Sequence, residues 1–110
     1  MGNLSELIEK RFGVKTRAVV SSIVSLAALG QLVLNANPDR LALIIVNMSA
    51  NDIYLAFDTQ VTTTRGVFLA KGGGSMSLTV EEDFELVGYA IYGASAAYPS
   101  AIFAVEIEAE

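Results

Sequence analysis

The sequence predicts an all-β fold, an antiparallel β-sandwich or jelly roll of about seven or eight strands, preceded by a short N-terminal helix. From residue 16 onward, short apolar runs rich in β-branched residues alternate with turn sequences. No segment with helical periodicity separates these runs, which argues against parallel strands joined by helices. The 110 residues fit one domain, so we expect a helical arm at residues 1–15 and a β-sandwich domain at residues 16–110.

The N-terminal segment has the pattern of a short amphipathic helix. Asn3 and Glu6 have the spacing of a capping box, and Gly13 is a typical residue after a helix end. The apolar residues on one helical face are Leu4, Leu7, Ile8 and Phe12. Because a helix this short is not stable alone in water, its apolar face must dock. It packs either across the open end of its own sandwich or on a neighbouring subunit, as an arm anchored by these four residues.

The expected strands follow from the apolar runs and the turns between them. NPDR (37–40) is typical of a type I turn, SAND (49–52) of a short hairpin loop, and DTQVTTTRG (58–66) of a longer polar loop. KGGGS (71–75) and SAAYPS (95–100) are expected to close the later strand pairs. The strands are then expected at residues 16–26, 31–35, 41–48, 53–58, 66–70, 75–80, 86–93 and 101–108.

Two of these strands, 41–48 and 86–93, are apolar on both alternating faces, whereas an antiparallel sheet usually has one face in water. Strands 75–80 and 101–108 each show one wet face instead. In the last strand, the apolar side is expected to consist of Phe103, Val105 and Ile107, opposite Glu106 and Glu108.

A two-layer sandwich buries only one face of each sheet, so the second apolar face of strand 41–48 needs a cover. The N-terminal segment or another subunit can supply it. The candidate partner-binding residues of this sheet face are Ile44, Val46 and Met48. Tyr98, beside Pro99 in an expected loop tip, is a further candidate contact.

Residues 18–34 carry no charge, and three interpretations are open. The segment can be a pair of strands joined by a bend at AALGQ, the apolar region of a signal peptide, or a short membrane anchor. Its many β-branched residues favour the strand pair. A secreted or membrane-anchored protein is therefore the less favoured alternative.

Charge is distributed unevenly along the chain, whose net charge is −5. Residues 1–17 carry four basic and two acidic residues, a net charge of +2, whereas residues 18–110 carry three basic and ten acidic residues, a net charge of −7. The acidic body should repel nucleic acid. The basic start is suited to an acidic neighbour, including a copy of its own body.

No catalytic or metal-binding signature stands out. The chain has no cysteine and no histidine, so thiolate zinc sites and histidine bases are excluded. KGGGS lacks the residue order of a phosphate-binding loop, and EEDFE (81–85) lacks the spacing of a calcium-binding EF-hand. Tyr54, Tyr89, Tyr92 and Tyr98 are expected to be strand packing more than a sugar-binding platform. We therefore expect no enzyme activity, no cofactor and no metal.

The stretch LVLNANPDRLALIIVNMSANDIYLAF (32–57) resembles a pattern of small structural proteins of tailed bacteriophages. The matching positions are Ala36, Asn37, Pro38, Arg40, Asn47, Asp52, Ile53 and Tyr54. The downstream GVFLAKGGGSMSL looks like the glycine-rich hairpin of such proteins. The resemblance covers residues 32–107 and leaves the first 17 residues outside it.

This resemblance implies a virion structural protein without cofactors, most simply a capsid decoration or head-associated protein. A tail or baseplate component is the alternative, as is a carbohydrate-binding appendage that uses the loops around Tyr98 and Thr62–Arg65. The implied partners are its own subunits, in a homo-oligomer, and the major capsid or other virion proteins, with no nucleic acid and no membrane. The implied location is the virion, assembled in the host cytoplasm.

Overall fold

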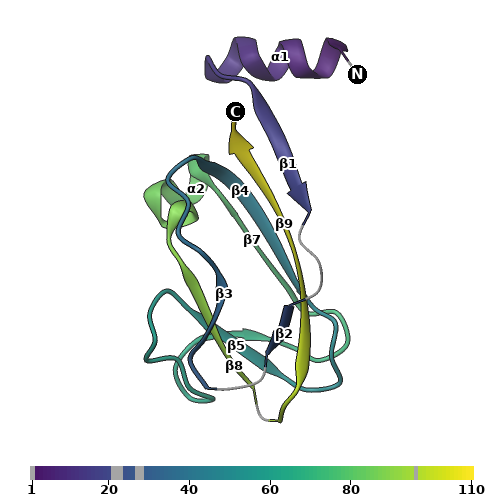
Figure 1. Ribbon diagram of the computed structural model, residues 1–110, viewed down its shortest axis with the longest axis vertical. Coiled ribbons are helices and arrows are strands. Elements are labelled where there is room, and N and C mark those ends of the chain that lie inside the picture. Colours follow the sequence, from purple (N-terminus) through teal and green to yellow (C-terminus); the bar gives the residue numbers. More distant parts are fainter. Residues whose placement is uncertain (1, 21–23, 27–28, 96) are drawn as a thin grey trace.

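The computed structural model describes residues 2–20, 24–26, 29–95 and 97–110, and these form two β-sheets packed face to face with a helix projecting from one end (Figure 1). The molecule measures 44 × 24 × 18 Å. Its elements are α1 (Gly2–Phe12), β1 (Thr16–Val20), β2 (Val24–Leu26), β3 (Gln31–Leu34), β4 (Arg40–Asn47), β5 (Ile53–Ala56), β6 (Val67–Leu69), β7 (Ser75–Thr79), α2 (Val80–Asp83), the 3₁₀ helix η1 (Phe84–Gly88), β8 (Ile91–Ser95) and β9 (Ser100–Ala109).

The strand order is that of a jelly roll. Sheet A has the order β1-β9-β4-β7, with β2 also paired to β9, and sheet B has the order β3-β8-β5-β6. All pairs are antiparallel. Early strands pair with late ones, as in a long hairpin rolled into two layers, so each sheet alternates strands from both halves of the chain. The predicted fold class is confirmed, with nine strands in the described residues.

The core lies between the two sheets and is built from the inward residues of every central strand. Leu43 and Ile45 of β4 and Ile102 and Ala104 of β9 come from sheet A, and all four are at most 1% exposed. Sheet B contributes a matching set, Val33, Leu34, Ile53, Leu55, Leu69 and Ile91. Burial of these side chains is the main force that holds the layers together.

Arg40 is buried at the end of the core nearest α2, and it is held by four hydrogen bonds. Its guanidinium donates to Glu106 Oε1 at 2.6 Å, to the Val87 and Tyr89 carbonyls at 3.1 Å and to the Asn35 carbonyl at 2.7 Å. A β-bulge between Arg40 and Ala42 changes the alternation, so that Arg40 turns inward together with the odd-numbered residues of β4. Arg40 therefore ties the β3–β4 turn, η1 and β9 together.

Three turns expected to close strand pairs instead carry the chain from one sheet to the other. SAND joins β4 of sheet A to β5 of sheet B, and KGGGS and SAAYPS likewise join strands of different sheets. NPDR, expected as a type I turn, also leads from one sheet to the other. The long polar loop is the exception, because β5 and β6 do pair. Turn chemistry is the same at a hairpin and at a sheet-to-sheet corner, so the local sequence did not distinguish them.

The expected strand at residues 86–93 is wrong in its first half. Residues 84–88 form η1, and β8 begins only at Ile91. Thr79 caps the preceding helix α2 by accepting from the Glu82 N–H, and Asp83 accepts from the Thr79 N–H in return. EEDFE thus lies in a capped helical corner.

The uncharged segment 18–34 is built into the sandwich wherever it is described. Residues 18–20 belong to β1, residues 24–26 to β2 and residues 31–34 to β3, while residues 21–23 and 27–28 lie outside the described residues. Leu26 is fully buried in the core. Within the described part of the chain, no helix is long and apolar enough to cross a membrane.

Candidate interaction surface

The outer face of sheet A, turned away from the core, is apolar across its width. Cross-strand partners share a face, and one row runs Val20–Val105–Ile44–Ser77 over β1, β9, β4 and β7. The neighbouring rows run Ala18–Ile107–Ala42–Thr79 and Phe103–Val46–Ser75. None of these residues carries a charge. We call them together the outer face.

The outer face is open to solvent. Val20 is 64% exposed, Ile44 51% and Ile107 41%, and Phe103 and Val105 are half-buried. Ile44 lies between Leu43 and Ile45, which are buried in the core. Strand β4 is therefore apolar on both sides, as its sequence predicts, and one of those sides has no cover among the described residues.

A hollow of about 380 Å³ lies at the end of the outer face next to α2. Its lining is mainly apolar and includes Leu41, Ala42 and Ile107, together with Val80. Glu81 and Glu82, from the short helix α2, form an acidic rim on one side. The hollow therefore offers an apolar floor beside negative charge, which suits an apolar segment that also carries a basic residue.

Helix α1 stands at the same end of the molecule, beyond the sandwich (Figure 1). Its last turn is tied to α2 by an ion pair between Arg11 Nη2 and Glu81 Oε1 at 3.1 Å. Gly13, at φ +75°, ends the helix, and its N–H donates to the Glu9 carbonyl. The left-handed conformation of Gly13 turns the chain from α1 into β1.

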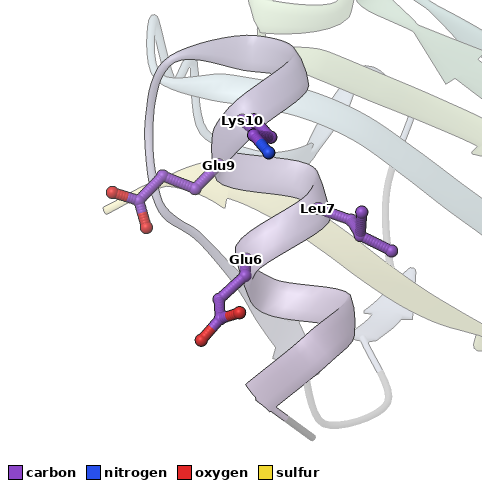
Figure 2. Close-up of a pocket in the computed structure, with 4 residues that line it drawn as sticks. All are labelled: Glu6, Leu7, Glu9 and Lys10. Carbon is purple, nitrogen blue, oxygen red and sulfur yellow. The ribbon is translucent and has the colours of Figure 1, made fainter.

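The described part of the apolar face of α1 is not buried. Leu4 is 56% and Leu7 64% exposed. Figure 2 shows Leu7 projecting from one side of the helix and Glu6 and Glu9 from the other, beside a shallow hollow of about 600 Å³. The side chains of Ile8 and Phe12, the other two predicted anchors, lie outside the described residues. For Leu4 and Leu7, the structure contains no dock on the chain's own sandwich.

The remaining predicted contact residues separate into two places. Ile44 and Val46 lie together on the outer face, and Met48, 57% exposed, follows β4 directly. Tyr98 lies instead in the β8–β9 connection, where its hydroxyl accepts from the Ser95 N–H at 3.1 Å. Tyr98 is thus separate from the outer face.

The face of strand β9 was assigned wrongly from the sequence. Ile102 and Ala104 are buried in the core, whereas Phe103, Val105 and Ile107 belong to the outer face. The expected wet residues, Glu106 and Glu108, point inward at the sandwich end, where Glu106 meets Arg40 and Glu108 meets Arg17 and Asn37. The pattern alone did not reveal this, because the cation that compensates Glu106 is 66 residues away in the sequence.

Glu108 is held in its charged form by two donors. The Asn37 side-chain amide donates at 2.6 Å, and Arg17 donates at 2.9 Å. These hydrogen bonds, that of Asn37 first, lower the pKa of the Glu108 carboxyl below its ordinary value of 4.5. At neutral pH the carboxylate therefore fastens β1 and the NPDR turn to β9.

The four tyrosines do not form one platform. Tyr54 packs against Phe68 on the outer side of sheet B, with ring centroids 5.5 Å apart, and Tyr92 lies on the neighbouring strand β8. Tyr89 meets Phe57 edge-on at 6.3 Å near η1, where a second hollow of about 700 Å³ includes Arg40 and the exposed Phe84. The Nε and both Nη atoms of Arg40 already donate to Glu106 or to backbone carbonyls, so Arg40 serves the fold rather than a ligand in this hollow.

The acidic residues do not gather into a metal centre. Among the described residues, no group of three or more carboxylates is arranged to hold a metal ion. The glycine-rich KGGGS segment is likewise occupied by the fold, because Gly72 and Gly73 donate to the Ser49 and Asn47 carbonyls. The outer face and the adjacent hollow are therefore the surface features that stand out.

Comparison with known proteins gives one likeness. No protein-family model matches the chain. No curated protein sequence matches it. A search of solved structures finds dTDP-4-dehydrorhamnose 3,5-epimerase from Bacillus anthracis, solved with TDP and PPi bound, at a TM-score of 0.46 and 19% sequence identity. The match covers 96% of this chain and 61% of the epimerase, so the chain spans about three fifths of that protein's length.

This result contradicts the predicted biological role. The matched protein is a bacterial enzyme, and none of the three comparisons returned a virion protein. The predictions of a non-enzymatic virion structural protein, of its capsid, tail and appendage variants and of a virion location are therefore wrong. With a TM-score of 0.46, the likeness assigns no reaction to this chain. Assembly with its own subunits, in contrast, stays a prediction.

Proposed function

We propose that this chain is a self-associating jelly-roll protein that works as a homo-oligomer, with the outer face of sheet A as its subunit interface. The observation that supports this most directly is the row Val20–Val105–Ile44, an uncharged and partly exposed strip in the middle of a sheet. Covering apolar surface gains about 25 cal/mol per Å² before the cost of association. Covering the outer face in a subunit interface would therefore yield a favourable free energy from apolar burial.

The charges favour one contact in particular between two copies, that of the basic N-terminal segment of one with the acidic body of the other. The body carries −7 and the N-terminal segment +2, so two bodies repel each other while the segment of one copy is attracted to the body of the next. The outer face itself carries no charge, so no buried charge has to be compensated when two copies meet there. Nucleic acid is disfavoured by the same negative body.

Sheet B offers a competing face, and it is the natural control. Its outer side includes Tyr54 and Phe68, whose rings pack together, and Tyr92 on the adjacent strand β8. Phe68 is 53% exposed, close to the 51% of Ile44. The acidic-rimmed hollow beside α2 and helix α1, however, both adjoin sheet A. Sheet A therefore combines an apolar face with a site for the basic segment.

The test is the native mass of the full chain and of two matched variants. The wild-type protein should appear as a multiple of 11.6 kDa at micromolar concentration. Ile44→Arg places a charge in the centre of the outer face and should give monomers, while Phe68→Arg on sheet B should leave the oligomer intact. A wild-type chain that stays at 11.6 kDa, or an oligomer broken by Phe68→Arg alone, would refute the proposal.

A further inference from the structure

The outer face by itself is a modest subunit interface. Four strands spaced about 4.8 Å apart, with β4 eight residues long, give a face with a planar area of about 500 Å². A stable interface buries about 800 Å² of accessible surface on each partner. Self-association through sheet A, the proposal on which this inference rests, is therefore strengthened by any further contact beside this face. Helix α1, with its unburied leucines, is positioned to supply it.

We infer that helix α1 of one subunit inserts its apolar side into the acidic-rimmed hollow of a second copy. Leu7 would fill the apolar floor formed by Ala42 and Ile107. Lys10, one helical turn after Leu7, would then reach the rim residue Glu82. Reciprocal insertion closes a pair about a two-fold axis, and both contacts are made twice.

The chain's own hollow is not the dock, because of how α1 is attached. The last turn of α1 lies beside its own α2, where Arg11 and Glu81 form an exposed ion pair. The turns that carry Leu4 and Leu7 extend beyond the sandwich (Figure 1), and both leucines stay more than half exposed. The three-residue link 13–15 leads directly into β1, which is paired with β9 from Thr16 onward. The leucines are thus presented outward while the C-terminal end of the helix is anchored.

Charge complementarity points to the same partner. Lys10 and Glu82 are both exposed, and neither takes part in the ion pairs found in the described part of the chain. Glu82 stands on the rim of the hollow, and Lys10 is an exposed residue of the helix whose leucines, Leu4 and Leu7, lack a dock. The hollow also shares Ala42, Thr79 and Ile107 with the outer face, so one continuous surface would include both contacts.

A charge-reversal pair tests this contact between copies. Lys10→Glu and Glu82→Lys should each raise the dimer Kd about tenfold, because two like-charge contacts replace two attractive ones. An equimolar mixture of the two variants should recover wild-type affinity, because each α1 then faces a hollow of opposite charge in the other copy. A contact within one chain cannot be repaired by mixing.

Leu7 is tested by a second pair of full-length variants. Leu7→Gln keeps a good helix former and should raise the dimer Kd at least tenfold, whereas Leu29→Gln, at a similarly exposed leucine away from the hollow, should not. If Ile44→Arg yields monomers while the α1 and Glu82 variants behave like wild type, the outer-face interface stands and the α1 contact is wrong. A wild-type monomer would instead refute the interface proposal itself.

Discussion

Arg40 and Glu106 form a nearly buried ion pair, with Nε and Oε1 2.6 Å apart and side chains only 1% and 13% exposed. The pair closes the end of the sandwich beneath η1, where the other Arg40 donors hold three backbone carbonyls. Its burial and its long sequence separation make it the contact on which the α2 end of the fold most depends.

Replacing Arg40 by methionine should destabilise the protein by about 3–5 kcal/mol, because Glu106 loses its nearly buried ion-pair partner and three carbonyls lose their donor. Urea unfolding monitored by circular dichroism measures the change. Arg65→Met is the matched control, since the Arg65–Asp58 pair is more than half exposed and should contribute little. Equal stability losses in the two variants would contradict the structural role given to Arg40.

Asn47→Ala should cost about 1–3 kcal/mol, because a fully buried amide links two connections. Its Nδ2 donates to the Asn51, Leu69 and Ala70 carbonyls, and its Oδ1 accepts from Ser49. Hydrogen exchange should show faster opening of the KGGGS connection. Gln60→Ala, at an exposed side chain in the long polar loop, is the control and should leave both stability and exchange unchanged.

Glu108 should make stability fall at acid pH. Because its pKa in the folded protein is lowered, first by Asn37 and then by Arg17, its contribution is present above the ordinary value of 4.5 and is lost as the pH falls through the lower folded value. The Tm of wild type should therefore exceed that of Glu108→Gln near neutrality, and the two should converge on acidification. The lowered pKa of Asp58 affects both proteins equally. A Tm difference that stays constant down to strongly acid pH would contradict this prediction.

Gly74→Ala should destabilise the corner between β6 and β7. A Cβ at this position would overlap the backbone of Ala70, whose carbonyl accepts the Gly74 N–H at 2.9 Å. Relief requires the backbone to shift, at a cost of about 1–3 kcal/mol by the general scale for overpacking. Chemical denaturation measures it, with Ser75→Ala next in the chain as the control. Equal stability of the two variants would show that the corner adapts freely.

Local patterns were sufficient wherever the determining forces are local. The two apolar faces of β4 follow directly from the alternation of its residues, and the structure places Leu43 in the core and Ile44 outside. The turn sequences also lie between strands as expected, and Gly13 ends the first helix. The partner residues Ile44 and Val46 of the candidate surface came from this reasoning.

Where partners are distant in sequence, local patterns misled. The apolar side of β9 was assigned to the core, yet Phe103 and Val105 lie on the outer face because Arg40 draws Glu106 inward. The acidic-rimmed hollow combines residues of β1, β4, β7, β9 and α2, and no short motif encodes it. Val20 was missed for the same reason, because only pairing with β9 places it beside Val105.

By itself, the sequence determined that this is an all-β chain with a short helix in a basic N-terminal segment and one strand too apolar for a two-layer sandwich. These properties depend on residue alternation, turn chemistry and composition, which act over a few residues. Only the tertiary structure decided the jelly-roll order, which face of β9 is buried, and that the outer face ends in a hollow beside α1. The physical reason is that antiparallel pairing joins strands such as β1 and β9 from opposite ends of the chain, so these faces arise only when the sheets form.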